Sequence, residues 1–274
     1  MRFEIVTIFP GFFAGIFEHG IVRRAQAEGL VTVSLHDLRD FTHDRHRTVD
    51  DRPFGGGEGM VLKPEPLAEA MGSLGVVPKA ARKPEESAAG STRVILLSAQ
   101  GRPFTQAVAR ELAALERVVM ICGRYEGVDE RINQLYCDME LSIGDYVLSG
   151  GELAAAVVVD AVMRLLPGVL GNEASGEFES FGAADAEIVV DERGVPRSQH
   201  GAGGLLDYPH YTRPAAFGGL AAPEVLLNGD HQQIRRWRRE QQLRKTLANR
   251  PDLLERAKLS DGDRRLLASI GWQR

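Results

Sequence analysis

Two short apolar runs, RVILLS at 93–98 and RVVMICG at 117–123, constrain the fold most. Both are apolar at successive positions rather than at alternate ones, and a helical pattern over 104–115 separates them. Short strands that are apolar on both sides are typical of a parallel sheet with helices on both of its faces. The sequence therefore predicts an α/β fold with a mainly parallel sheet.

The N-terminal part of the chain repeats this alternation. Residues 3–9 and 30–38 have strand patterns, and 13–29 between them has helical spacing. A further helix, rich in alanine and valine, is predicted over 152–168, where a Pro-Gly pair ends it. We expect these elements to form one α/β domain over residues 1–170.

The C-terminal part differs in composition and charge. One helix is predicted over 231–249 and another from Pro251 onward. From Gly229 to the end, twelve Lys and Arg stand against six Asp and Glu, although the whole chain has a formal net charge of −5. A basic end of this kind permits contact with a polyanion such as RNA, but a solvated helix face has the same composition. We expect a small helical domain over 207–274, joined to the first by a linker over 171–206.

Composition also restricts the cellular compartment that we expect for this chain. The longest apolar run, AAAVVVDAV at 154–162, is too short to span a bilayer and contains Asp160. No membrane association is therefore expected. The two cysteines, Cys122 and Cys137, fit neither a metal-binding pattern nor a disulfide framework. These features predict a reduced, cytoplasmic protein without a structural metal.

Two glycine-bearing loops carry most of the functional information. They are CGRYEGVDER at 122–131 and SIGDYVLSGGEL at 142–153, and each follows a short apolar stretch. Glycine allows positive φ angles and lets backbone amides approach a ligand closely. Neither loop has the GxxxxGK[ST] pattern of nucleotide-phosphate binding, and no GxGxxG follows the first strand. The loops therefore predict a small-ligand site, and they argue against a nucleoside triphosphate and against a dinucleotide-dependent dehydrogenase.

Seven segments, read in order, closely resemble the bacterial tRNA (guanine-N1)-methyltransferases, knotted S-adenosylmethionine enzymes that modify guanosine 37 beside the anticodon. One such segment would be a weak signal, whereas seven in register are specific. Together they are distributed over residues 39–238, with none of them in 79–92 or 182–203. The segments are RDFTHDRHRTVDDRPFGGGEGM at 39–60, LLSAQGR at 96–102, CGRYEGVDER at 122–131, SIGDYVLSGGEL at 142–153, PGVLGNEAS at 167–175, GLLDYPHYTRP at 204–214 and GDHQQIRRWR at 229–238.

The resemblance implies a trefoil knot in the N-terminal domain, which no periodicity in the sequence could show because knots are so rare. It also implies a homodimer with active sites shared between subunits, and a helical C-terminal domain that helps to hold tRNA. The expected contacts with S-adenosylmethionine, the methyl donor, lie in and beside the glycine loops. They are Leu97, Ser98, Gly123, Tyr125, Glu126, Ile143, Gly144, Asp145, Tyr146, Val147, Leu148, Gly150 and Gly151.

The acceptor nitrogen, N1 of guanine, carries a proton at neutral pH and is a poor nucleophile. Its methylation needs a base for that proton and a cation for the charge that develops at O6. The resemblance assigns the cation to Arg164, at the end of the apolar helix. It places Glu179 where the family has an aspartate base, and the linker that follows is longer than usual. Asp207 and Asp185 are therefore the alternative bases.

The segment 39–60 mixes histidine, arginine, aspartate and glycine, a composition suited to contacts with a flipped guanine and its phosphates. A charged surface loop is the simpler alternative. The expected tRNA contacts are His46, Asp50, Arg52 and Gly59 in this segment and Arg235 and Arg236 in the C-terminal helix. The resemblance leaves room for a magnesium ion that assists catalysis.

Two other functions fit part of the same sequence. Another knotted RNA methyltransferase, acting on a ribose hydroxyl or on ribosomal RNA, would share the donor loops but would not need the same base. A non-catalytic RNA-binding module would keep the fold and would bind no methyl donor. The atom that is methylated separates the first alternative, and donor binding separates the second.

Overall fold

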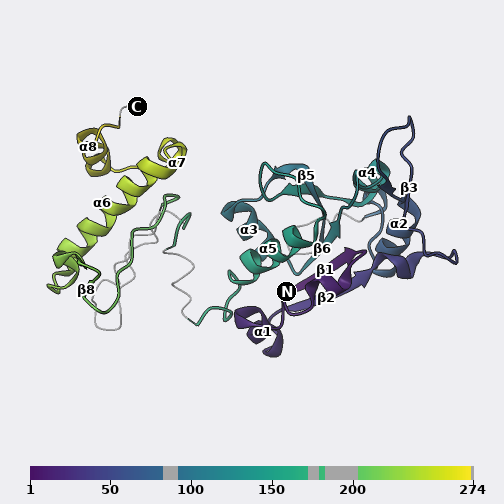
Figure 1. Cartoon of the computed structure of the whole chain (residues 1–274), viewed down its shortest axis with the longest axis horizontal. Helices are drawn as coiled ribbons and strands as arrows, with labels where there is room; N and C mark the ends of the chain where they lie inside the picture. Colours follow the sequence, from purple (N-terminus) through teal and green to yellow (C-terminus); the bar gives the residue numbers. More distant parts are fainter. Residues whose placement is uncertain (83–91, 172–178, 183–202, 273–274) are drawn as a thin grey trace. The chain divides into compact units, whose positions relative to one another are not determined.

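The computed structural model describes residues 1–82, 92–171, 179–182 and 203–272, and it contains two compact units (Figure 1). The first unit comprises Met1–Gly171 and the second Asn172–Arg274. Among the described residues, no helix has both the length and the apolar character needed to cross a membrane.

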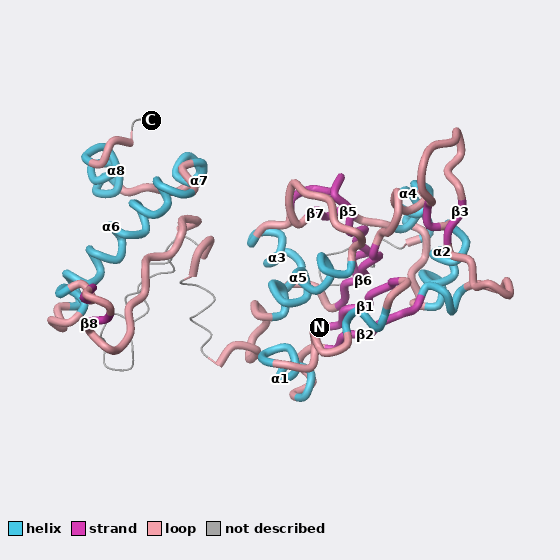
Figure 2. Tube along the Cα trace, viewed as in Figure 1, coloured by secondary structure: helices cyan, strands magenta, loops and turns pink. Residues whose placement is uncertain are grey.

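The first unit is built on a five-stranded parallel sheet with the order β2-β1-β6-β5-β7, drawn in magenta in Figure 2. The strands are β1 (Arg2–Thr7), β2 (Thr32–Asp37), β5 (Thr92–Pro103), β6 (Arg117–Cys122) and β7 (Met139–Ser142). The predicted α/β fold and its parallel sheet are confirmed. The four predicted strands correspond to β1, β2, β5 and β6, whereas β7 was not predicted.

Both faces of the sheet are buried, which explains the continuous apolar runs. In β6, Val118 and Met120 face one hydrophobic cluster, while Val119 and Ile121 face the other. The first cluster is covered by α1 (Gly20–Ala27), α3 (Gln106–Ala113) and α5 (Glu152–Met163), and the second by α2 (Pro64–Ser73) and α4 (Glu130–Tyr136). Helices on both faces thus make a three-layer α/β/α unit.

Short elements connect this framework. The 3-10 helices in the described part of the chain are η1 (Pro10–Phe13), η2 (Leu38–Phe41), η3 (Lys79–Ala81) and, in the second unit, η5 (Glu224–Leu226). A small antiparallel pair, β3 (Asp50–Asp51) and β4 (Val61–Leu62), closes the glycine-rich segment between them.

Two helix predictions were too long. The helix expected over 13–29 begins only at Gly20, because η1 is followed by turns and Gly15 has a φ of +85° that a helix does not allow. The helix expected over 152–168 ends at Met163, four residues before Pro167. The helices α2 and α4 were not predicted, and α4 has only seven residues.

Strand β5 passes β7 in an irregular way. Leu97 and Arg102 both pair with Leu141, so residues 98–101 leave the register and β5 then returns to the same partner. Gly101 lies in this excursion and touches the backbone of Glu140 and Leu141. A side chain at position 101 would prevent this approach.

The second unit is mainly helical in its described part. It contains the hairpin β8 (Ala216–Phe217) and β9 (Leu220–Ala221), followed by α6 (His231–Asn249), α7 (Asp252–Arg256) and α8 (Asp261–Ser269). The helix predicted over 231–249 is confirmed, and the one expected from Pro251 is α7. The core of the unit is formed by Leu205, Leu243, Leu254 and Leu267.

Candidate functional site

The two glycine loops meet at the carboxyl ends of β5, β6 and β7, where parallel sheets commonly bind their ligands. The N–H of Gly151 donates a hydrogen bond of 2.9 Å to the carbonyl of Gly123. Next to it, Arg124 and Gly150 form an antiparallel bridge. Two loops separated in the sequence are therefore joined backbone to backbone.

Between these loops lies a cavity of about 380 Å³. Twelve of the thirteen residues expected to contact a methyl donor line it, and Asp145 does not. The twelve are Leu97, Ser98, Gly123, Tyr125, Glu126, Ile143, Gly144, Tyr146, Val147, Leu148, Gly150 and Gly151. Apolar walls with convergent backbone and polar groups are typical of a small-molecule site.

Several other lining residues were not predicted as contacts. They are Leu96, Ala99, Gln100, Arg124, Gly127, Val128, Glu130, Glu140, Leu141, Ser142, Ser149 and Ala154. Arg124 and Glu130 lie within the first glycine loop, so its sequence already contained a signal for them. Glu140 belongs to β7, a strand that was not predicted, and its place in the cavity follows from the sheet order.

Backbone geometry at the cavity is unusual at two positions. A Cβ atom on Gly151 would lie 2.8 Å from the Cα of Cys122, so only glycine allows the second loop to lie directly on the first. Tyr125 has a φ of +59°, which is rare for a residue with a side chain. Such strain is concentrated at functional sites, because the surrounding structure must maintain it.

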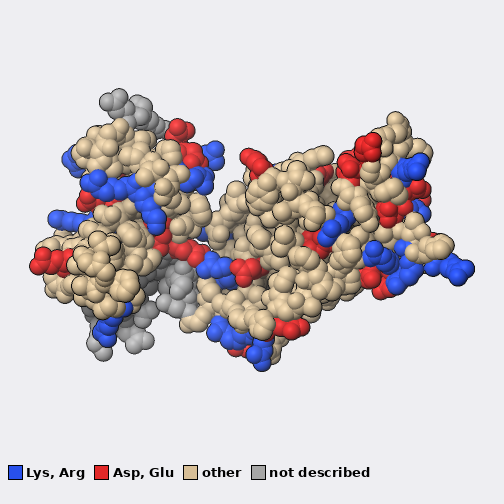
Figure 3. All heavy atoms as spheres, in the orientation of Figure 1, with Lys and Arg blue, Asp and Glu red and all other residues tan. Residues whose placement is uncertain are grey.

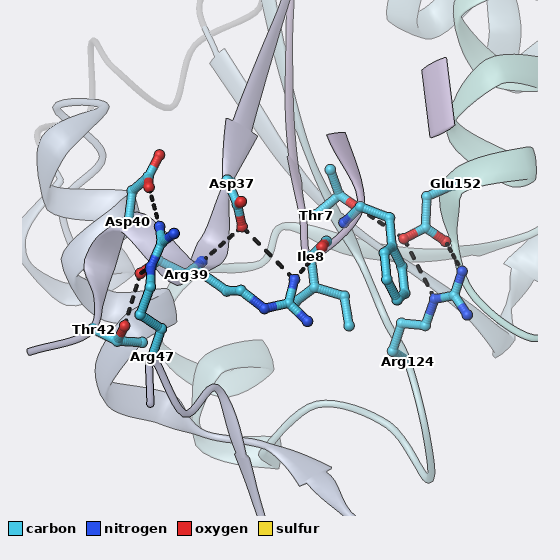
Figure 4. Close-up of polar contacts among 10 residues, drawn as sticks. Thr7, Ile8, Asp37, Arg39, Asp40, Thr42, Arg47, Arg124 and Glu152 are labelled. Carbon is cyan, nitrogen blue, oxygen red and sulfur yellow. Dashed lines mark hydrogen bonds and ion pairs between the residues drawn. The ribbon is translucent and has the colours of Figure 1, made fainter. Parts of the chain in front are cut away.

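A buried polar network lies beneath the junction of the loops (Figure 4). Glu152, the first residue of α5, is 1% exposed, and it accepts a hydrogen bond of 2.7 Å from Oγ1 of Thr7. Its Oε2 lies 3.2 Å from Nη2 of Arg124. The guanidinium of Arg124 in turn lies 4.5 Å from the ring centroid of Phe9. The end of β1, the first glycine loop and the start of α5 are thus connected.

The same carboxylate affects the thiol beside it. Burial raises the pKa of Cys122 well above its usual value, the negative charge of Glu152 raises it further, and Arg124 opposes the change. Burial also raises the pKa of Cys137, to about 12. Both thiols therefore stay protonated at neutral pH, and neither is a nucleophile.

The segment that contains His46, Asp50, Arg52 and Gly59 borders the cavity. The N–H of Glu126 donates to the carbonyl of Met60 at 3.0 Å, which ties the segment to the first glycine loop. Gly59 has a φ of +80°, and its Cβ would lie 2.4 Å from Oε1 of Glu126. Asp50 is half-buried in β3, whereas His46 and Arg52 are exposed. The structure thus places Gly59 against the cavity wall and leaves the side chains of His46 and Arg52 open to solvent.

Asp44 shapes the exposed turn around His46. Its carboxylate accepts hydrogen bonds from the N–H groups of His46 and Thr48 and from the Thr48 hydroxyl. These bonds, that of the Thr48 backbone foremost, lower the pKa of Asp44. On the same surface Arg47 pairs with Asp40, as Figure 4 shows.

The two residues expected to act on the acceptor belong to different units. Arg164 follows the last turn of α5 in the first unit, and its N–H donates to the carbonyl of Asp160. Glu179 belongs to the second unit, where its carbonyl accepts from the N–H of Gly182.

Of the two alternative bases, Asp207 is described and Asp185 lies outside the described residues. The N–H of Asp207 donates to Oγ of Ser180, so Asp207 and Glu179 lie on neighbouring chain segments. The carboxylate of Asp207 accepts from Nε2 of His210 at 2.9 Å and from the N–H of Tyr208 at 2.8 Å. Asp207 is thus already engaged within its own segment.

The remaining expected tRNA contacts lie on α6 of the second unit. Arg236 is exposed and Arg235 half-buried, and Figure 3 shows blue cationic side chains over the region of this helix. Asp230 caps the start of the helix, and its carboxylate accepts hydrogen bonds from the N–H groups of Gln232 and Gln233. Arg238 lies over the ring of Tyr208, so it contributes to packing rather than to an open surface.

Among the residues that the structure describes, no group of three or more histidine, cysteine, aspartate and glutamate side chains could hold a metal ion.

Comparisons with known proteins agree over nearly the whole chain. A family model described as tRNA (Guanine-1)-methyltransferase TrmD matches residues 1–256. A protein of Koribacter versatilis named tRNA (guanine-N(1)-)-methyltransferase is 56% identical over 270 residues, which cover 98% of each chain. Proteins with the same name are 50% identical in Chloroflexus aggregans (99% of this chain, 96% of the relative) and 48% identical in Geobacter sulfurreducens (98% of each).

Proposed function

This chain belongs to the tRNA (guanine-1)-methyltransferase family and methylates N1 of a guanine in tRNA, and we propose that it modifies guanosine 37 with S-adenosylmethionine bound in the cavity between the two glycine loops. The observation that carries the proposal is the convergence of twelve expected donor contacts on that one cavity. The family implies the methyl donor. Its place in this cavity and the residues that act on the guanine are part of the proposal.

The cavity fits the donor in size and in chemistry. Its volume of about 380 Å³ lies in the usual range for small-molecule sites. Leu97, Ile143 and Leu148 provide apolar cover for an adenine, and the joined backbones at Gly123 and Gly151 offer polar groups at close range. The donor supplies an electrophilic methyl group attached to a sulfonium. Glu126 provides a carboxylate at the wall, which favours a ligand with a positive charge.

In the proposed mechanism Glu179 accepts the proton from N1 of guanine. A carboxylate near such a nitrogen acts as a general base, and Asp207, whose carboxylate accepts hydrogen bonds from Tyr208 and His210, is the alternative. Arg164 stabilises the negative charge that develops at O6 as the proton leaves.

We assign tRNA binding to the exposed part of 39–60 and to α6. In the first, Gly59 brings the segment against Glu126, and His46 and Arg52 remain available for phosphate or base contacts. In the second, Arg235 and Arg236 provide positive charge for the RNA backbone.

The proposal includes a trefoil knot, a homodimer and a cytoplasmic location. The knot is proposed from the family to which the chain belongs. Leu153 and Val157, on α5 beside the cavity, are 50% and 45% exposed, which supports burial against a second copy. Two buried thiols that stay protonated are compatible with a reducing compartment.

A methyl-transfer assay on unmodified tRNA transcripts tests the function directly. Transcripts with guanosine at position 37 should accept one methyl group at N1, and transcripts with adenosine there should accept none. Methylation of a ribose hydroxyl would support the rival knotted enzyme. Calorimetry that detects no binding of S-adenosylmethionine would support the non-catalytic module. Repeating the assay with a chelator tests whether a magnesium ion assists catalysis: loss of activity would indicate that it does, and unchanged activity that it does not.

A further inference from the structure

Glu152 is a buried charge that the proposed reaction does not use. Its side chain is 2% exposed, and among the described residues of the first unit it is the one carboxylate in the buried core. Burying a carboxylate costs several kcal/mol unless hydrogen bonds and an opposite charge compensate it. The fold therefore has to maintain Glu152 against a large penalty.

Three features compensate this charge. The hydroxyl of Thr7 donates to Oε1 at 2.7 Å, and Arg124 reaches both oxygens, with Nη2 3.2 Å from Oε2 and Nε 3.5 Å from Oε1. In addition, Glu152 is the first residue of α5, where the helix dipole favours a negative charge. Thr7 is itself fixed, because its Oγ1 accepts the N–H of Phe9 at 3.0 Å.

The ion pair lies directly beneath the second glycine loop. A Cβ atom on Gly150 would lie 2.3 Å from Nε of Arg124 and 2.4 Å from Oε2 of Glu152. The loop backbone therefore lies on the paired side chains. Arg124 also lines the cavity, whereas Glu152 does not.

We propose that Glu152 is a positioning residue, which holds Arg124 so that the two glycine loops keep the spacing the donor requires. This inference rests on the proposed function of the cavity. Glu152 touches no ligand itself; it acts through Arg124 and through the backbone that lies on the pair. Phe9 limits Arg124 from a further side, because the guanidinium lies over its ring, 4.5 Å from the centroid.

The test compares Glu152→Gln with Arg124→Gln and with the double variant in the full-length protein. Glu152→Gln should raise the Kd and the KM for S-adenosylmethionine about tenfold and leave the KM for tRNA unchanged, because a small displacement of the loops weakens donor contacts first. Asp160→Asn is the matched control, since Asp160 is exposed on the same helix and loses the same charge. It should leave every constant unchanged.

The double variant shows whether Glu152 acts through Arg124. If it does, the double variant should bind the donor about as weakly as Arg124→Gln alone, because the two residues form one unit. If the double variant instead raises the donor Kd by the product of the two single factors, the two residues act independently and the proposal is overturned. A fall in kcat at unchanged donor KM would also overturn it, because that result indicates fewer folded molecules and no change in the site.

A milder change tests the proposal if Glu152→Gln does not fold. Thr7→Val removes the hydrogen bond to Glu152 and the one that Thr7 accepts from the N–H of Phe9, but it retains the ion pair, so the donor Kd should rise about threefold in a folded protein. An unchanged Kd in this variant would contradict the proposal. Failure of the wild-type protein to bind the donor would instead overturn the proposed function of the cavity, and the inference with it.

Discussion

A Cβ atom on Gly101 would lie 2.5 Å from the backbone nitrogen of Leu141, so these two residues meet backbone to backbone. Leu141 is also the residue that pairs with β5 on both sides of the excursion at 98–101. The contact involves main-chain atoms of β5 and of the edge strand β7, and main-chain atoms cannot rotate away as a side chain can. A methyl group at position 101 must therefore move the strands themselves.

Replacement of Gly101 by alanine is expected to destabilise the first unit by at least about 2 kcal/mol, as overpacking of a rigid interior does. The measurement is the free energy of unfolding in urea. Gly72→Ala is the control, because Gly72 lies near the end of α2 with no atom within 4 Å of its Cβ position. Alanine in a helix should be neutral or stabilising by up to about 1 kcal/mol. Equal effects of the two variants would contradict the contact at Gly101.

Replacement of Gly59 by alanine should displace the carboxylate of Glu126 and weaken donor binding. The new methyl group would lie 2.4 Å from Oε1 of Glu126, and the side chain would have to turn away. Gly55→Ala is the matched control, since its φ of +87° is close to the +80° of Gly59 but no atom lies within 4 Å. Calorimetry should show a donor Kd about tenfold higher for Gly59→Ala than for Gly55→Ala. An equal donor Kd in the two variants would mean that Gly59→Ala acts only through backbone strain and that the contact with Glu126 is unimportant for donor binding.

Asp263 is expected to make the second unit sensitive to acid. Its carboxylate binds Nε and Nη2 of Arg239 at 3.0 and 2.8 Å and caps α8 through Ser260. Burial alone would raise the pKa of Asp263, but the hydrogen bonds from Arg239 and Ser260 outweigh it and lower the pKa. A lowered pKa means that this stabilisation is complete above the usual aspartate pKa of about 4 and is lost as the pH falls through the folded value.

The corresponding variant, Asp263→Asn, should therefore lose about 2 kcal/mol of stability at pH 7 and progressively less below pH of about 4. Thermal melting at several pH values measures this difference. Asp252→Asn is the control, because Asp252 forms an exposed pair with Arg250 and its loss should hardly change Tm. A difference for Asp263→Asn that does not vary with pH would contradict a role for its charge.

Charge reversal at both Arg235 and Arg236 should weaken tRNA binding and reduce its salt dependence. Removing one phosphate contact lowers the slope of log K against log salt by about one, so a decrease of about two is expected for the pair. The control is the double change Arg256→Glu and Lys258→Glu, two exposed residues with the same total charge. If the two double variants weaken tRNA binding equally, the effect comes from net charge alone, and Arg235 and Arg236 of α6 have no specific role.

How much of the fold and of the candidate site could be predicted from the sequence depended on how far apart in the chain the interacting residues lie. The strands β1, β2, β5 and β6 were predictable because burial on both faces leaves a local apolar pattern. Strand β7 was not, since its four residues, MELS, carry too little pattern, and its place beside β5 follows from chain topology. The glycine loops indicated most of the cavity. The pairing of Thr7 with Glu152, 145 residues away, could not be predicted, because no local signal connects them.

Replacement of Glu179 by glutamine tests the proposed base and should lower kcat by about 10²- to 10⁴-fold, the usual contribution of general-base catalysis. Donor affinity should hardly change, because Glu179 does not line the cavity. Asp207→Asn is the matched comparison, because it removes the alternative carboxylate, which accepts hydrogen bonds from Tyr208 and His210. Single-turnover methylation of tRNA measures both. Retained activity in Glu179→Gln together with abolished activity in Asp207→Asn would transfer the base to Asp207. Because the two residues lie on neighbouring segments joined through Ser180, that result would leave the location of the base in the second unit unchanged.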